Sequence, residues 1–273
     1  MVRGERLGGI KLPIASHLLP YYLFMKNLLI ILGPTACGKT EFAARLAYVI
    51  DGEIISADSR QVYRGMDIGT GKDLADYHVN GSDIPYHLID IADAGTRYNV
   101  YEWQRGFLDA YEDITNRGKT PILCGGTGMY IESVVKAYEF DGRKFPDFHS
   151  LIIGLDISRD LRREKISRRL HARLEEGMVE EIKGLIDRGV PTEQLIRYGL
   201  EYKYVTLYLL GELAYDEMVR LLEIAIHQFA KRQMTWFRGM EERRGIDIHW
   251  LSVDTPIEER IEQAKELWMM QTA

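Results

Sequence analysis

The sequence predicts an α/β fold in which a parallel sheet has helices on both faces, followed by a C-terminal helical part. Three observations predict it. Short apolar runs alternate with helical segments through the first 157 residues, which is typical of a parallel sheet. The first such run, residues 27–32, leads directly into a glycine-rich loop. From Ser158 almost to the end of the chain, the sequence has the character of long helices instead.

The glycine-rich loop at residues 33–40 matches the phosphate-loop pattern G-x-x-x-x-G-K-T. It lies between the apolar run and a helical segment at 41–50, so backbone N–H groups and the amino end of the helix converge on a phosphate chain. Lys39 adds a positive charge, and Thr40 offers a hydroxyl ligand to a divalent metal ion. We therefore expect a P-loop NTPase-like sheet. The candidate phosphate-binding residues are Gly33, Pro34, Thr35, Ala36, Cys37, Gly38, Lys39 and Thr40.

Further strands and helices follow in order along the chain. A helix from the capping residue Asn99 to about Arg117 has apolar positions at helical spacing, and Gly118 ends it. A last helix is expected at 258–270. The remaining expected strands are 53–57, 86–91, 120–124, 151–155 and 247–251.

Polar or glycine-rich turns follow two of these strands. Residues 58–63 (D-S-R-Q-V-Y) come directly after the second strand, and residues 125–130 (G-G-T-G-M-Y) after the fourth. Open α/β sheets bind their ligands at the carboxyl ends of the strands. A further glycine-bearing loop lies at 66–72. We expect these turns to surround the phosphate loop.

Composition is that of an ordinary globular protein, with 46% hydrophobic and 28% charged residues among 273. The net charge of −6 argues weakly against a nucleic-acid partner. Basic residues are nevertheless concentrated at 159–173, with six Arg and one Lys, and again at 231–244. These two segments are candidate phosphate-contacting surfaces, although solvated helix faces look the same.

Location and domain organisation follow from simple counts. The two cysteines, Cys37 and Cys124, have no metal-ligand spacing and favour a reducing, cytoplasmic location. No run approaches the roughly 18 apolar residues of a membrane helix. We expect a monomer with a peripheral extension at 1–24, a P-loop core at 25–157 and a C-terminal helical part at 158–273 that packs on the core.

Taken together, these segments resemble the tRNA dimethylallyltransferases. The resemblance spans roughly residues 27–251. It implies transfer of a dimethylallyl group from dimethylallyl diphosphate to the N6 amine of adenosine 37, next to the anticodon of tRNA, with Mg²⁺ as cofactor. The matching segments are G-P-T-A-C-G-K-T (33–40), D-S-R-Q-V-Y (58–63), M-D-I-G-T-G-K (66–72), H-L-I-D (87–90), G-G-T-G-M-Y (125–130) and A-K-R-Q-M-T-W-F-R (230–238).

The resemblance also implies residue roles. The loop at 33–40 would hold the diphosphate, and Thr40 would help to place Mg²⁺. Thr127 and Arg197 would contact the same diphosphate, and Asp58 would act as general base toward the adenine amine. The acceptor-binding residues would be Asp58, Ser59, Arg60, Gln61, Lys231, Arg232, Gln233 and Arg238.

One departure from the family leaves the acceptor open. Its members usually insert a helical domain, which embraces the anticodon stem-loop, before the fifth strand. Here only about fifteen residues, 137–151, separate the two flanking elements. A free adenine nucleotide, as used by the adenylate isopentenyltransferases, is therefore the alternative acceptor. The phosphate loop alone would also permit a P-loop kinase.

Overall fold

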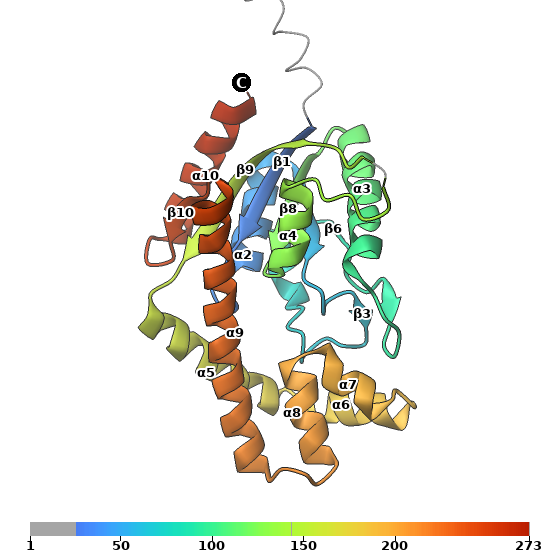
Figure 1. The fold of residues 1–273 in the computed structure, drawn as a ribbon. Helices are drawn as coiled ribbons and strands as arrows, with labels where there is room; N and C mark the ends of the chain where they lie inside the picture. Colours follow the sequence, from blue (N-terminus) through green and yellow to red (C-terminus); the bar gives the residue numbers. More distant parts are fainter. Residues whose placement is uncertain (1–25, 143, 273) are drawn as a thin grey trace, which may run out of the picture.

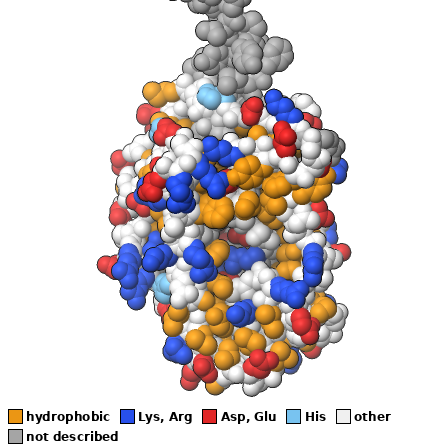
Figure 2. All heavy atoms as spheres, in the orientation of Figure 1, with side chains coloured by type: hydrophobic (Ala, Val, Ile, Leu, Met, Phe, Trp, Pro, Cys, Tyr) orange, Lys and Arg blue, Asp and Glu red, His pale blue; other side chains and the backbone are white. Residues whose placement is uncertain are grey.

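The computed structural model describes residues 26–142 and 144–272 (Figure 1). The expected N-terminal extension at 1–24 lies outside these residues. The upper half of the molecule in Figure 1 is a sheet with helices on both faces, and the lower half is a group of helices. Lys and Arg side chains gather across the middle of the face shown in Figure 2, where the two halves meet. The expected α/β fold class is confirmed.

The central sheet has six parallel strands in the order β10-β9-β1-β8-β2-β6. All six expected strands are present. The third is shorter than expected because Leu88 and Asp90 have positive φ angles of 63° and 56°, which end the extended backbone after His87. The strands are β1 (Lys26–Leu32), β2 (Gly52–Ala57), β6 (Tyr86–His87), β8 (Thr120–Gly125), β9 (Phe148–Asp156) and β10 (His249–Ser252).

Both faces of the sheet are buried, so the strands are apolar on both sides, as in α/β proteins generally. Leu28, Ile30 and Leu32 of β1 belong to the core under α3 (Val100–Asn116) and α4 (Gly128–Val135). Leu29 and Ile31 face α2 (Lys39–Ile50) and α10 (Ile257–Thr272) on the other side. The residue-by-residue alternation of one strand thus supplies two separate cores.

The helix α3 begins as the sequence predicts. The Asn99 side chain accepts hydrogen bonds from the backbone of Tyr101 (3.0 Å) and Glu102 (3.1 Å), while Glu102 accepts one from the Asn99 backbone (3.0 Å). This reciprocal capping box satisfies amides at the first turn that have no partner within the helix.

The connection from α4 to β9 is short and packs against α3. Phe145 is buried, and its ring lies 6.5 Å from that of Phe107. Phe148, at the start of β9, meets the same Phe107 ring edge-on at 5.4 Å. This connection leaves α4 and enters β9 at the amino edge of the sheet, the edge away from the phosphate loop.

The helical half comprises five helices that share the core of the α3 face. Leu195, Tyr202 and Leu222 belong to the same buried cluster as Leu28 and Ile30 of the sheet. The 30-residue helix α9 runs from the far end of the helical half back along the sheet (Figure 1). The helices are α5 (Arg159–Glu175), α6 (Met178–Asp187), α7 (Thr192–Tyr198), α8 (Leu200–Leu209) and α9 (Tyr215–Arg244).

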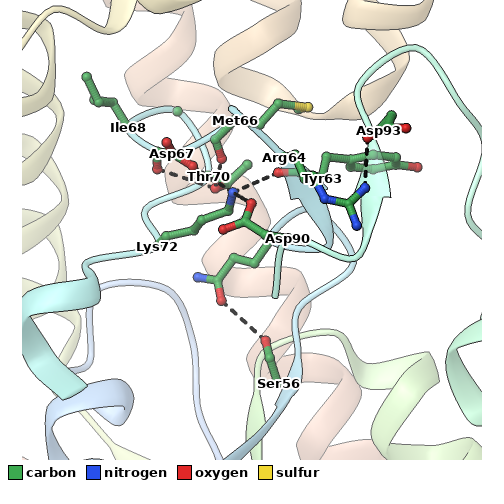
Figure 3. Close-up of polar contacts among 12 residues, drawn as sticks. Ser56, Tyr63, Arg64, Met66, Asp67, Ile68, Thr70, Lys72, Asp90 and Asp93 are labelled. Carbon is green, nitrogen blue, oxygen red and sulfur yellow. Dashed lines mark hydrogen bonds and ion pairs between the residues drawn. The ribbon is translucent and has the colours of Figure 1, made fainter. Parts of the chain in front are cut away.

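The segment 66–72 connects the two halves, and Lys72 fixes it to the sheet side. The Lys72 side chain is 1% exposed. Its Nζ atom donates to the Tyr63 carbonyl (2.7 Å) and to the carboxylates of Asp67 (2.7 Å) and Asp90 (Figure 3). A buried ammonium with three acceptors is fully satisfied, so its charge is tolerated in the interior.

Glu181 of α6 holds the same segment from the helical side. Its carboxylate accepts hydrogen bonds from the backbone amides of Asp67 (2.8 Å), Ile68 (2.7 Å) and Gly69 (3.1 Å). The Tyr202 hydroxyl donates a fourth, at 2.7 Å. The segment 66–72 is therefore anchored to both halves.

We expect Lys72→Met to lower the free energy of unfolding by about 3 kcal/mol, because it leaves two carboxylates and a buried carbonyl without their shared donor. Chemical denaturation measures the change. Arg64→Met is the control, since the Arg64–Asp93 ion pair (2.7 Å) has side chains that are 53% and 76% exposed and should contribute less than about 1 kcal/mol. Equal losses in the two variants would contradict the anchoring role of Lys72.

Candidate functional site

A polar pocket opens at the carboxyl edge of the sheet, between the phosphate loop, the turn after β2 and the helical half. It brings together residues that lie far apart in the sequence, including four cationic and four acidic side chains. It is lined by Thr35, Ala36, Gly38, Lys39, Thr40, Ser56, Asp58, Arg60, Gln61, Thr70, Gly71, Asp73, Asp76, Tyr77, Cys124, Gly125, Arg169, Arg173, Glu201 and Gln233.

The phosphate loop forms one wall of this pocket. Lys39 and Thr40 open α2 and are half-buried there. Within the described part of the chain, no carboxylate forms an ion pair with Lys39. Cys37 is buried beneath the loop, and burial raises the pKa of its thiol, which keeps the sulfur protonated and uncharged. The exposed side of the loop thus offers amides, one ammonium and one hydroxyl to an anion.

Gln233 of α9 fixes the phosphate loop to the turn at 125–130. Its side-chain oxygen accepts from the Thr35 amide (2.8 Å), and its Nε2 atom donates to the Gly126 carbonyl (2.9 Å). Gln233 is buried, and both ends of its amide are engaged. The side chain thus positions two turns of the site, and its expected contact with the acceptor stays a prediction.

Two of the three glycines of that turn allow α9 to approach. A Cβ atom on Gly126 would lie 2.5 Å from the Gln233 Nε2 atom, and one on Gly128 would lie 2.4 Å from the Trp236 ring. Real Cβ atoms do not come so close to other heavy atoms, so a side chain at either position would force Gln233 or Trp236 to shift. The G-G-T-G pattern is therefore explained by helix packing as well as by phosphate chemistry.

Asp58 follows β2 and enters the pocket with one oxygen free. Its Oδ1 atom accepts from the Arg60 backbone amide (2.9 Å) and lies 3.7 Å from the Arg60 guanidinium. Its Oδ2 atom has no hydrogen bond to any residue that the structure describes. The Asp58 side chain is 15% exposed, so a ligand in the pocket can reach it.

Arg60 is engaged by carboxylates rather than presented to a ligand. It donates to Glu201 of α8 (3.2 Å), and its guanidinium lies 5.2 Å from the centre of the Phe229 ring. Burial alone would lower the pKa of Arg60, but the Asp58 and Glu201 carboxylates outweigh that effect and raise it. Arg60 is thus a permanent cation beside Asp58.

Thr127, Ser59 and Gln61 are tied to neighbouring turns. The Ser59 amide donates to the Thr127 hydroxyl (3.0 Å), which in turn donates to the Ser59 hydroxyl (3.3 Å). Gln61 donates to the Gly71 carbonyl (3.0 Å). These contacts join the turn after β2 to the segment 66–72 and to the turn after β8. The expected substrate roles of Thr127, Ser59 and Gln61 stay predictions.

The remaining candidate cations, all on α9, lie outside the pocket lining. Lys231 and Arg232 are exposed on α9, and Arg232 lies 5.9 Å from the Phe229 ring centre. Arg238 stacks on Trp250 at 4.0 Å and pairs with Asp156 and Glu241. None of these three lines the pocket. Their expected contact with the acceptor therefore stays a prediction.

Arg197 does not reach the pocket. It is exposed on α7, because the buried residues Leu195 and Tyr198 turn the other side of that short helix toward the core. The expected contact of Arg197 with a diphosphate is therefore not formed. Arg169 and Arg173 of α5 line the pocket instead. Sequence analysis assigned them to a surface cluster, although their four-residue spacing beside Ile166 and Leu170 indicates an inward face.

Two kinds of site are absent from the residues that the structure describes. No group of three or more His, Cys, Asp or Glu side chains is placed to hold a metal ion. No helix in this part of the chain is long and apolar enough to cross a membrane. A metal ion here would therefore depend on ligand oxygens, together with the hydroxyl of Thr40 and the carboxylates lining the pocket.

Comparison with known proteins identifies the family. The model of the family described as IPP transferase matches residues 61–150 and 137–240, and the model described as isopentenyl transferase matches residues 26–82. A protein named tRNA dimethylallyltransferase 2 from Phocaeicola vulgatus is 53% identical, with 87% of this chain and 96% of the relative covered. The chain belongs to the tRNA dimethylallyltransferase family.

A second relative and a solved structure support the same family. A tRNA dimethylallyltransferase 2 from Bacteroides fragilis is 51% identical over 88% of this chain and 97% of its own length. The crystal structure of a tRNA isopentenylpyrophosphate transferase from Bacillus halodurans superposes with a TM-score of 0.81 at 27% identity, covering 91% of this chain and 97% of that one. Fold and family are thus supported by sequence and structure independently.

The same comparisons locate the missing insertion of this family member. The alignment with the Phocaeicola protein is 295 residues long although only 87% of the 273 residues here take part, so the relative carries additional residues. The IPP transferase model matches in two pieces that overlap at 137–150, within the connection from α4 to β9. This is where the sequence analysis expects the helical insertion to be absent.

Asp76, in the pocket lining, makes the free energy of unfolding depend on pH. Burial, together with the neighbouring carboxylates of Asp73 and Glu41, raises the pKa of Asp76 to about 6. A raised carboxyl pKa means that the folded state binds the proton more tightly than the unfolded state does. The contribution of Asp76 to stability is therefore largest below about pH 4 and is lost as the pH rises toward 6.

We expect Asp76→Asn to remove this loss. The variant should gain on the order of 1 kcal/mol relative to the wild type between pH 4 and pH 7, a figure reduced for solvent screening because Asp76 is only partly buried. Urea denaturation at several pH values measures the difference. Asp147→Asn, at an exposed position, is the control and should show no such trend. A difference that shrinks as the pH rises would contradict the assignment.

Proposed function

We propose that this protein transfers a dimethylallyl group from dimethylallyl diphosphate to the N6 amine of adenosine 37 in tRNA. The observation that carries this proposal is that the phosphate loop and the free oxygen of Asp58 open into one pocket. A site for a diphosphate and a site for a proton acceptor are thereby adjacent, as an alkyl transfer from a diphosphate to an amine requires. The family membership supplies the identity of the two substrates.

Leaving-group stabilisation is the first task of the site. As the bond between carbon and the diphosphate oxygen breaks, negative charge grows on the diphosphate, and preorganised donors at that position lower the barrier. The loop amides and Lys39 supply such donors, and no carboxylate of the described residues pairs with Lys39. Mg²⁺ would add further neutralisation of the diphosphate, with Thr40 as its protein ligand.

Proton removal is the second task. Adenine N6 is a weak nucleophile because its lone pair is delocalised into the ring. When N6 forms its bond to the allyl carbon, the amine loses a proton, and the Asp58 Oδ2 atom is placed to accept it. The Arg60 backbone amide and guanidinium both engage the Oδ1 atom of this carboxylate, which leaves the Oδ2 atom for the proton.

Acceptor binding is assigned to the surface around the pocket mouth. A base within a tRNA loop has to leave its stack to enter such a pocket, as in other RNA-modifying enzymes. Exposed cations on α5 and α9 flank the pocket, among them Arg163, Arg168 and Arg232. The buried free thiols of Cys37 and Cys124 fit a cytoplasmic location, where such an RNA would be met.

We expect Asp58→Asn to leave the affinity for dimethylallyl diphosphate nearly unchanged and to slow transfer by roughly 100-fold or more, the scale of a lost general base. Calorimetry measures donor binding, and transfer of labelled dimethylallyl to tRNA measures turnover. Lys39→Ala is the contrasting variant and should weaken donor binding first. An equal collapse of donor affinity in both variants would make Asp58 a binding or structural residue instead.

A second prediction tests whether tRNA is the acceptor and whether α5 binds its phosphates. With the insertion absent, tRNA affinity has to rest on phosphate contacts, and each contact contributes about −0.7 to −0.9 to the slope of log K against log salt. Replacing Arg162, Arg163 and Arg168 together by Gln should flatten this slope by roughly two units. The control replaces Arg105, Lys119 and Lys265, which lie away from the pocket.

Equal slopes in the two triple variants would exclude α5 as the RNA-binding surface. Free nucleotide is the competing acceptor, and the short connection from α4 to β9 favours a smaller acceptor than whole tRNA. Turnover on AMP without measurable tRNA binding would therefore assign the protein to the free-nucleotide class and overturn the proposed function.

A further inference from the structure

Arg173 is a buried cation at the pocket that the reaction described above does not use. It lies in the last turn of α5, where the negative end of the helix dipole favours a positive charge. The residue is 8% exposed and lines the pocket together with Thr35 and Ala36 of the phosphate loop. Arg173 thus faces the loop that would hold the diphosphate.

Arg173 differs from the two neighbouring arginines in its hydrogen bonds within the described part of the chain. Its neighbour Arg169 donates to Asp73 at 2.9 Å, and Arg60 donates to Glu201 at 3.2 Å. The Nη2 atom of Arg173 is fully buried and has no hydrogen-bond partner among the described residues; its ion-pair partner Asp73 lies 3.6 Å away. A buried guanidinium without a hydrogen-bonded acceptor is unfavourable unless a ligand completes it.

The electrostatics agree with this geometry. Burial, and then the adjacent Arg169 charge, lowers the pKa of Arg173 to about 10. The group therefore stays protonated at neutral pH, yet its surroundings compensate its charge incompletely. An anion entering the pocket would accept a hydrogen bond from Arg173 and would also compensate its charge.

Gly71 makes room for this cation. It has a φ angle of +65°, and a Cβ atom there would overlap the guanidinium groups of both Arg169 and Arg173. The segment that carries Gly71 is held by Lys72 and Glu181, so it cannot easily move aside. Because Gly71, the second glycine of M-D-I-G-T-G-K, has no side chain, both arginines can pack against the backbone of this segment.

We propose that Arg173 is a ligand of the diphosphate group of the allylic donor, opposite the phosphate loop. This inference depends on the proposed function for the identity of the anion. Arg173 would hold the diphosphate between α5 and the loop and would stabilise the charge that grows on it as the carbon–oxygen bond breaks. It would fill the role that the sequence analysis expects of Arg197.

A structural role for Arg173 makes the opposite prediction about stability. If Arg173 served only to hold Asp73, its removal would destabilise the fold. If it is kept for a ligand, replacement by an apolar side chain of similar length should leave the ligand-free protein as stable or more stable. The sign of the stability change therefore separates the two roles.

The test compares Arg173→Met and Arg173→Lys with the wild type, using inorganic diphosphate as the probe. Arg220→Met is the control, because Arg220 is a helical arginine on α9 that is 63% exposed and outside the pocket. Calorimetry should show diphosphate affinity falling roughly 10- to 100-fold in Arg173→Met, the scale of a lost charge-assisted hydrogen bond, and less in Arg173→Lys. The melting temperature without ligand should not fall.

Unchanged diphosphate affinity in Arg173→Met, or a lower melting temperature with unchanged affinity, would overturn the proposal. So would a loss confined to binding of an anticodon stem-loop RNA in the absence of donor, since that would make Arg173 a contact for RNA phosphates. Loss of diphosphate affinity supports the proposal even if the wild type transfers no dimethylallyl group to tRNA. In that case the proposed function alone fails.

Discussion

The pocket depends on one constraint: the segment 66–72 is anchored from both sides by buried charged groups. Lys72 fixes the segment to the sheet half, and Glu181 binds three successive amides of it from α6. Through the Gly71 carbonyl the segment also orients Gln61, in the turn that carries Asp58. Asp58, the segment and the arginines of α5 are thereby held in a fixed arrangement, although they come from three separate parts of the sequence.

Charges around the pocket are divided into two classes. Arg60 and Arg169 are each hydrogen-bonded to a carboxylate and contribute a fixed, largely neutralised framework. Lys39 and Arg173 lack such a hydrogen-bonded partner among the described residues, and both line the pocket. These two cations therefore keep hydrogen-bonding capacity that an anion in the pocket could use.

Local signals were sufficient to predict the sheet, the phosphate loop and the Asn99 cap, because each depends on a short run of residues. The third strand was predicted too long, since the positive φ angles of Leu88 and Asp90 leave no mark on an apolar pattern. Contacts between residues far apart in the sequence were harder to predict. Arg197 and Arg173 are both arginines on helices, and only the packing of α5 and α7 decides which of them enters the pocket. Gln233 lies in a motif that suggests substrate binding, yet its partners are backbone atoms almost 200 and more than 100 residues away.

The short connection from α4 to β9 lies at the amino edge of the sheet, whereas the pocket opens at the carboxyl edge. Phe145 and Phe148 of this connection pack on Phe107 of α3. Chain length can therefore vary at this place without any change in the groups that carry out the chemistry. An insertion at this place, as in the longer relatives, would therefore leave the pocket residues where they are.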